Sequence, residues 1–325
     1  MKSFTISPDM SGKKVIRASL AAFPSLSAPT LQKALRSRDI RMNGRRVSSD
    51  VPVSEGDCIE LWLPDSCFEK EGSSPITGMD DYKTVFETDY LLLVNKRPGL
   101  AVHPGKGESG GTLIEIIRRD TGNGNIDLCH RIDMNTGGLL LLAKGKESLE
   151  QAIRLFHEDR IIKRYRCLVR GVPDQGTPCV CADETLMKEL SAWLEKSARS
   201  NVFIHDDAGP DDLPITTRYR VLRVFKKAGP EGENVSEIEV ELVTGRTHQI
   251  RAHMAHLGHP ILGDGNYGRN SYNRFFKTAG GGFPKRQQLF ASSLIFSKIP
   301  RDNLHNGLSG RTFSIEPRYD VQLGK

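Results

Sequence analysis

The stretch from Cys129 to Lys144, CHRIDMNTGGLLLLAK, places the strongest constraint on how this chain can fold. Four consecutive leucines and an alanine, preceded by Gly137-Gly138, are typical of a strand that is buried on both faces. The polar loop before this strand carries His130, Arg131 and Asp133. A loop held by a rigid strand is a common place for a reactive carboxylate. A solvated loop with a surface ion pair explains the same residues equally well.

The positive charge of the chain is concentrated at its N-terminus. The 325 residues carry a formal net charge of +6, and residues 1–50 contain ten Lys and Arg against three Asp and Glu. The remainder is therefore close to neutral, and the length is sufficient for two or three domains. A compact basic segment is typical of nucleic-acid binding. The alternative is a basic face that serves only solubility.

The sequence predicts a cytoplasmic protein that does not enter a membrane. No run approaches the roughly 20 apolar residues that a membrane-spanning helix needs, and the first residues lack the apolar core of a signal peptide. The six cysteines form no CxxC pair. In a chain of this length they are expected to be reduced thiols and not a disulfide framework.

Residues 12–63 have the pattern of a small domain with two helices followed by a small sheet. Leu31 and Leu35 have helical spacing, and Asn43-Gly44 between alternating residues predicts a tight hairpin. This order, with arginines at the junction, resembles the S-four RNA-binding domain of ribosomal proteins. A plain solvated face remains the alternative for its basic residues. The residues expected to contact RNA are Lys33, Arg36, Arg38, Arg41 and Asn43.

Residues 64–82 are rich in Ser, Gly, Pro and Asp, which predicts a linker to a second domain at 83–325. Within that domain we expect an irregular insertion of unassigned role at 172–214 and a surface loop at 263–285. The predicted strands cover residues 90–96, 139–143, 161–169, 216–225, 236–243 and 289–296. The predicted helices include residues 113–119, a helix with Leu149, Ile153 and Phe156 on one face, and a helix within 244–257.

The segment 244–257, TGRTHQIRAHMAHL, predicts a turn from a strand into a helix. Ile250, Met254 and Leu257 form its apolar stripe, and Gly258 ends it. Arg251 lies off this stripe. The histidines of this region invite a metal-binding interpretation, but no HExxH pattern and no cysteine cluster accompany them, so we expect no metal.

Four blocks of the second domain together resemble the RluA family of pseudouridine synthases, and the resemblance covers essentially all of residues 83–325. An S-four-like domain also occurs in that family, among members that modify large-subunit ribosomal RNA. The blocks are LLLVNKRPGLAVHPG (91–105), HRIDMNTGGLLLLAK (130–144), KRYRCLVRG (163–171) and TGRTHQIRAHMAHLGHPILGDGNYG (244–268).

The resemblance implies an α+β fold in which the small α/β RNA-binding domain precedes a catalytic domain with a mixed, largely antiparallel sheet and flanking helices. It implies isomerisation of uridine to pseudouridine without a cofactor, on large-subunit ribosomal RNA. Asp133 matches the catalytic aspartate, and Arg251 matches the arginine expected to keep that carboxylate ionised. Tyr165 matches a tyrosine that stacks on the base. Arg131 matches the residue that fills the space left by the flipped uridine.

Two positions depart from the family pattern, and three other functions remain to be weighed. Gly137 stands where serine is usual, and Phe290 stands where histidine is common. Neither carries the expected chemistry.

The alternatives are a transfer-RNA pseudouridine synthase, a non-catalytic RNA-binding protein for ribosome assembly, and a nucleoside hydrolase, which would release free uracil. We expect a monomer, and which uridine is modified is not encoded in any motif.

Overall fold

The structure is a computed structural model, and it describes residues 2–23, 26, 28–63, 81–104, 111–196 and 202–323. The chain divides into two compact units, Met1–Met79 and Asp80–Lys325. Most of the predicted linker lies outside the described residues. Its last residue, Tyr82, is already the first residue of a strand of the second unit. Among the described residues, no helix is both long and apolar enough to span a membrane.

The described residues of the N-terminal unit form a four-stranded sheet in the order β1-β4-β2-β3 and two α-helices. The helices and the hairpin follow the sequence prediction. β1 was not predicted: it pairs with β4 from Lys2 to Thr5, so the sheet includes residues before position 12. A four-residue strand shows too little alternation to be recognised without its partner. The elements are β1 (Lys2–Thr5), α1 (Val15–Ala22), α2 (Ala28–Ser37), β2 (Ile40–Met42), β3 (Arg45–Val47) and β4 (Cys58–Leu61).

The hairpin between β2 and β3 turns at Asn43-Gly44, where both residues have positive φ, 53° and 75°. This is the conformation for which Asn-Gly is preferred. The Asn43 amide donates to Asp57 (2.8 Å) and accepts from the Cys58 N–H (2.8 Å). The side chain of Asn43 therefore has a structural task in joining the hairpin to β4.

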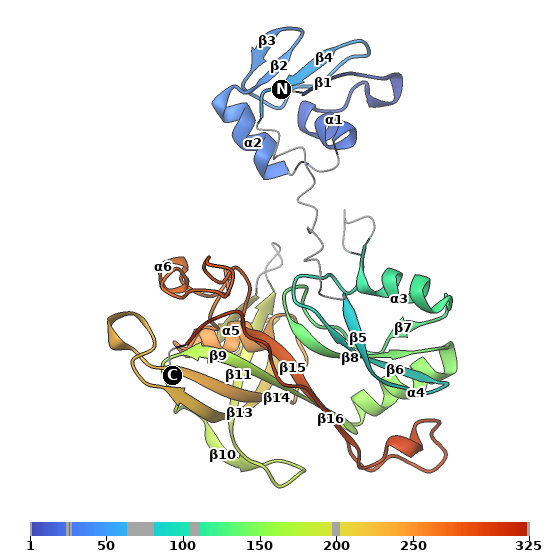
Figure 1. Cartoon of the computed structure of the whole chain (residues 1–325), viewed down its shortest axis with the longest axis vertical. Coiled ribbons are helices and arrows are strands. Elements are labelled where there is room, and N and C mark those ends of the chain that lie inside the picture. Colours follow the sequence, from blue (N-terminus) through green and yellow to red (C-terminus); the bar gives the residue numbers. More distant parts are fainter. Residues whose placement is uncertain are drawn as a thin grey trace. The chain divides into compact units, whose positions relative to one another are not determined.

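The second unit is built on a twelve-stranded sheet, counted over the described residues (Figure 1). Its main order is β10-β11-β13-β14-β9-β15-β8-β6-β5, with β12, β16 and β7 attached at β11, β15 and β8. All pairings are antiparallel except β15 with β8, which is parallel. This confirms the predicted α+β class with a mixed, largely antiparallel sheet. The strands are β5 (Tyr82–Glu87), β6 (Leu91–Lys96), β7 (Asp127–Leu128), β8 (Gly137–Ala143), β9 (Ile161–Arg170), β10 (Thr177–Val180), β11 (Leu186–Lys196), β12 (Val202–His205), β13 (Leu213–Phe225), β14 (Val235–Leu242), β15 (Leu289–Phe296) and β16 (Thr312–Ser314), and the helices are α3 (Leu113–Thr121), α4 (Lys146–His157), α5 (Gln249–His256) and α6 (Asn270–Asn273).

β8, the strand of the leucine run, lies between two apolar cores, as predicted. Leu140 and Leu142 pack in one core with residues of α3 and α5, whereas Leu139 and Leu141 pack in the other core with residues of α4. Each buried leucine side chain contributes about 1.5–3 kcal/mol. Burial on both faces explains why this strand has no alternation of apolar and polar residues.

The prediction of an irregular insertion at 172–214 was wrong. This segment contains β10, β11, β12 and the first residues of β13, which extend the main sheet. In β11, Leu190, Ala192 and Leu194 are buried, and the less buried Ser191 and Trp193 stand between them. Charged residues at both ends of β11 and short turns obscured this pattern in the sequence. Pairing with β13 determines it.

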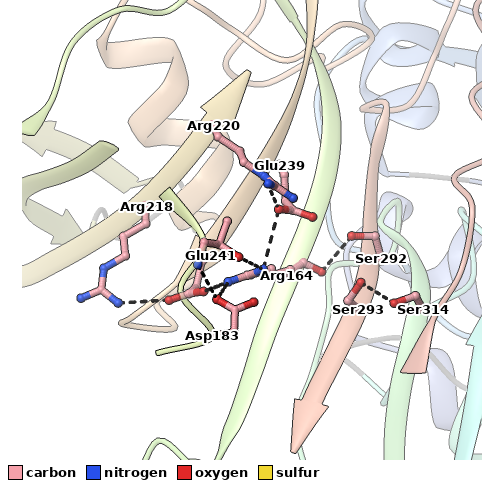
Figure 2. A network of polar contacts seen from close by, with 10 residues as sticks. Arg164, Asp183, Arg218, Arg220, Glu239, Glu241, Ser292, Ser293 and Ser314 are labelled. Carbon is pink, nitrogen blue, oxygen red and sulfur yellow. Dashed lines mark hydrogen bonds and ion pairs between the residues drawn. The ribbon is translucent and has the colours of Figure 1, made fainter. Parts of the chain in front are cut away.

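A ladder of arginine and glutamate side chains covers the face of β9, β13 and β14 opposite the apolar core (Figure 2). Arg164 donates to Glu241 (2.9 Å) and to Asp183 (2.7 Å), and Arg218 reaches the other oxygen of Glu241 (3.1 Å). The glutamates of β14 alternate with apolar residues, and Glu241 is buried with its charge paired to two arginines. Arg164 lies on the face of β9 that carries the ladder. Because successive side chains of a strand point to opposite faces, its neighbour Tyr165 lies on the other face.

Candidate active site

The residues expected to carry the chemistry surround one pocket of about 980 Å³. Most of its lining comes from the loop between β7 and β8, the middle of β9 and the turn that leads into α5, and the rest comes from residues 101–103, Leu242 and Leu289. The pocket brings together four of the predicted site residues, Asp133, Tyr165, Arg251 and Arg131. The other five predicted site residues, at positions 33, 36, 38, 41 and 43, belong to the N-terminal unit, which is a separate compact unit.

The loop that carries Asp133 is fixed by backbone contacts. The Thr136 N–H donates to the carbonyl of Asp133 (3.0 Å), and the Gly99 N–H donates to the carbonyl of Met134 (2.9 Å). Lys96 is buried, and its Nζ donates to the carbonyls of Arg97, Leu100 and Met134, each at 2.9 Å. Burial lowers the pKa of Lys96 to about 7, with the charge of Arg97 acting in the same direction. The ammonium group thus ties the 97–100 turn to the Asp133 loop.

Arg251 joins Asp133 to a second carboxylate. Its NH1 lies 2.9 Å from Asp133 Oδ2, while Nε and NH2 bind Asp264 at 2.6 and 3.1 Å. Only 6% of Arg251 is exposed, and Asp264 is completely buried. Burial lowers the pKa of Arg251, but hydrogen bonds and charge from Asp264, and then from Asp133, outweigh it and raise the pKa above its ordinary value. The guanidinium is therefore a permanent positive charge beside Asp133.

Asp264 is a site residue that the sequence analysis missed, because it placed residues 263–285 in a surface loop. Its Oδ1 also accepts the N–H groups of Asn266 (2.9 Å) and Tyr267 (3.1 Å). A carboxylate with this many donors is held in one orientation. The signal available in the sequence was an Asp followed closely by Asn and Tyr within a family-like block. A loop rich in Gly and Asn concealed it.

Tyr165 lines the pocket from β9 and is buried, with its ring in the apolar core. Burial and, secondarily, the negative charge of Asp133 raise the pKa of Tyr165, so its hydroxyl stays neutral at ordinary pH. A neutral aromatic ring beside a carboxylate is suited to stacking on a pyrimidine base. Arg131 lines the same pocket, and its side chain is exposed.

His248 is a second residue that the sequence analysis did not assign. It has positive φ (55°) directly before α5, its Nδ1 lies 3.0 Å from the Tyr267 hydroxyl, and its Nε2 lies 3.9 Å from Asp133 Oδ2. Burial lowers the pKa of His248, while Asp133 opposes the shift. The ring of Tyr267 also lies 5.2 Å from the Arg251 guanidinium. Tyr267 therefore supports both groups that approach Asp133.

The two departures from the family pattern touch each other. Phe290 of β15 pairs with Gly137 of β8, and a Cβ atom at Gly137 would lie 2.6 Å from the Phe290 ring and 2.9 Å from Pro98. A serine at position 137 thus requires Phe290 to move. The phenylalanine at position 290 therefore fits only because position 137 has no side chain.

The expectation that no metal is bound stays a prediction. Among the described residues, Glu195, His205 and Asp212 have possible ligand atoms within 4.8 Å of one another. Glu195 and His205 are about half exposed and lie on β11 and β12. None of the three lines the pocket of Asp133, and the histidines of α5 do not belong to this group.

Several known proteins are similar to this chain in fold or in sequence. The fold is similar to that of human RNA Pseudouridylate Synthase Domain Containing 1, with a TM-score of 0.55 and 24% identity over 74% of this chain and 89% of that chain. The protein named ribosomal large subunit pseudouridine synthase C from Salmonella typhi is 30% identical over 99% of this chain and 94% of its own length. Its namesake from Vibrio cholerae is 30% identical over 83% of this chain and 81% of its own length. The sequence profile of RNA pseudouridylate synthases matches residues 90–256, and the chain belongs to this family of isomerases.

Proposed function

We propose that this enzyme converts specific uridines of large-subunit ribosomal RNA to pseudouridine, with Asp133 as the catalytic carboxylate. The single observation that carries the assignment is the contact of Asp133 with the buried guanidinium of Arg251 in a pocket lined by Tyr165. The names of the relatives from Salmonella typhi and Vibrio cholerae support ribosomal RNA as the substrate class. Such an enzyme works in the cytoplasm.

The reaction breaks the bond between C1′ and N1 of uridine and forms a bond between C1′ and C5 of the same base. A proton leaves C5 and a proton is added to N1, so no external reactant is consumed. Asp133 acts on the nucleotide either as a nucleophile or as a base at the 2′ position. Arg251 holds the carboxylate in place through its NH1 group, 2.9 Å from Asp133 Oδ2, and Tyr165 stacks on the detached uracil so that it can turn without leaving.

The target uridine has to leave its stack in the RNA before it can reach Asp133, at a cost of a few kcal/mol. Arg131 is exposed at the pocket. We assign it the role of occupying the vacated stack, since a planar guanidinium can lie between bases. The pocket of about 980 Å³ is large enough for a nucleotide.

The substrate is tested by mapping pseudouridines with carbodiimide labelling in cells with and without this protein. We expect one or more uridines of large-subunit ribosomal RNA to lose their modification when the protein is absent, and a plasmid copy to restore it. Loss confined to transfer RNA would establish the alternative substrate. An unchanged pseudouridine map together with defective ribosome assembly would favour a non-catalytic assembly factor.

We propose that the N-terminal unit anchors RNA through sequence-independent contacts with phosphates. Lys33 and Arg36 are exposed on α2, and the Arg41 guanidinium lies 4.6 Å from the ring of the half-exposed Trp62. Paired cations and aromatic rings are suited to RNA strands. Arg38 lies directly after α2 and has positive φ (60°). The test replaces each of the four cations with glutamine, which removes the charge and keeps a long polar side chain.

Replacing Lys33, Arg36, Arg38 and Arg41 together with glutamine is expected to weaken RNA binding and to flatten its salt dependence. Each phosphate that is no longer neutralised should reduce the slope of log affinity against log salt by about 0.7–0.9. The measurement is a salt titration of binding to a large-subunit RNA transcript. The matched control replaces four exposed cations of the other unit, Lys226, Lys227, Lys298 and Arg301. Equal slopes for wild type and the four-site variant would contradict the proposal.

A further inference from the structure

A second pocket of about 460 Å³ lies in the segment that joins α6 to β15, outside the site of Asp133. In Figure 1 this segment forms the orange-red loops around α6, on the side of the unit where α5 lies. Thr278 and Asp320 line the pocket together with glycines of the loop. Phe283, Lys285 and Arg286 line this pocket, and Arg274, Phe275 and Lys277 directly precede it in the same segment. We call these six residues the basic-aromatic patch.

The patch exposes two phenylalanine rings to solvent. Phe275 is 53% exposed and Phe283 is 41% exposed. The Arg274 guanidinium lies 5.9 Å from the centre of the Phe283 ring. Exposed aromatic rings beside a cation offer a stacking platform for bases, which is worth about 1–3 kcal/mol per base in proteins that bind single strands.

The cations of the patch are not neutralised. Over the described residues, none of its four Lys and Arg side chains forms an ion pair. By contrast, Arg164 and Arg218 of the ladder on β9 and β13 are paired with carboxylates. Asp320 is the acidic residue among those lining the second pocket. An unpaired cluster of positive charge favours a polyanionic partner.

The loop between the two phenylalanines leaves its backbone open. A Cβ atom added at Gly280 or Gly281 would meet no atom within 4 Å, so neither glycine is needed for close packing against the rest of the unit. Gly281 has positive φ (83°), which its turn requires. With no side chains above Gly280 and Gly281, an extended strand can approach the patch closely.

Both ends of this segment are attached to the parts that hold the catalytic groups. The Asn273 amide binds the Gly263 N–H (2.9 Å) and the Asp264 carbonyl (3.1 Å), next to the carboxylate that holds Arg251. At the other end, Gln287 donates to Thr136 (3.3 Å) on the Asp133 loop. The patch is therefore continuous with the support of the active site.

We propose that the basic-aromatic patch binds the single-stranded RNA that flanks the target uridine, with bases stacked on Phe275 and Phe283 and phosphates beside the four cations. This inference rests on the proposed function, because it makes the patch a subsite of the same substrate. A flipped nucleotide requires the neighbouring strand to be held in place. Arg286 of the patch lies against Gly99, where an added Cβ atom would be 2.7 Å from its guanidinium carbon, and the Gly99 N–H binds the Asp133 loop at Met134. An acidic protein segment would use the cations but gain less from the aromatic rings.

The test uses the full-length chain carrying Asp133→Asn, so that binding is measured without turnover. Its probe is a fluorescein-labelled single-stranded RNA of 12 nucleotides, used beside a large-subunit RNA transcript. Phe283→Ala is expected to weaken binding of the oligonucleotide about tenfold. Replacing Arg274, Lys285 and Arg286 with glutamine should reduce the salt slope by about 2. Gly280→Glu, which places a negative charge where a side chain meets no atom, should weaken binding without affecting the thermal melting temperature.

Matched controls separate the patch from general effects of charge and exposed rings. Phe203, 54% exposed on β12, is replaced with alanine, and Lys298 and Arg301 are replaced with glutamine. These variants should bind as tightly as the unmodified protein. If the patch variants also bind normally, or if Gly280→Glu has no effect, the proposal is overturned. It is also overturned if the charge variants weaken RNA binding while Phe283→Ala and Phe275→Ala do not, since the bases then do not stack on the two rings. The proposed function is judged separately, by pseudouridine formation in the wild-type enzyme.

Discussion

Replacement of Asp133 with asparagine is expected to abolish pseudouridine formation, with a loss of about 10,000-fold or more in the single-turnover rate. Asparagine has nearly the shape of aspartate, and the Asp133 side chain is partly exposed, so the fold should remain intact. It cannot act as a nucleophile or as a base, whichever of these roles the carboxylate has. RNA binding should survive, because the stacking groups and the cations are unchanged.

The product has the same mass as uridine, so the measurement is carbodiimide labelling followed by primer extension. Asp127→Asn is the matched control: this aspartate lies on β7 shortly before the loop, is half exposed, and pairs only weakly with Arg118, at 3.9 Å. That variant should remain active. More than about one hundredth of wild-type activity in the Asp133 variant would end the assignment, because acid–base catalysis alone is worth about 100-fold or more.

Replacement of Arg251 is expected to cause the second large loss, in both activity and stability. Arg251→Ala leaves Asp264 completely buried without its ion pair, which costs about 3–5 kcal/mol. For a unit of this size that corresponds to roughly 10 °C in melting temperature. Arg251→Lys should restore little activity, because an ammonium group cannot contact Asp264 at two atoms and Asp133 at a third.

Two further variants show whether Arg251 acts by charge or by geometry. Asp264→Asn keeps Arg251 but weakens the contact that holds its guanidinium in place. We therefore expect a reduced rate. RNA affinity should be unchanged, since Asp264 is buried behind the guanidinium. Arg246→Ala removes an exposed cation of the same pocket and should keep Asp133 paired. Full activity of Arg251→Lys would mean that charge alone is sufficient. Single-turnover rates and thermal melting of all four variants measure these effects.

Local sequence was sufficient where the structure depends on neighbours in the chain. The leucine run predicts β8 because four apolar residues without alternation require burial on both faces. Asn43-Gly44 predicts its hairpin because these residues tolerate positive φ. Gly258, with φ of 84°, ends the helical segment of α5 where the sequence places its end. In each case the preference of the backbone and the fold agree.

The sequence alone was thus enough to predict the α+β class. It also predicts an N-terminal RNA-binding domain before a catalytic domain, with Asp133, Tyr165 and Arg251 as the candidate catalytic residues. Which groups support these residues depends on tertiary contacts. Asp264 is separated from Asp133 by more than a hundred residues, and only the packing of the 263–285 segment against α5 turns an apparently solvated carboxylate into the buried partner of Arg251. Glu241 is buried for the same kind of reason. The environment of a charge depends on the strands that fold around it, and those contacts are absent from any short stretch of sequence.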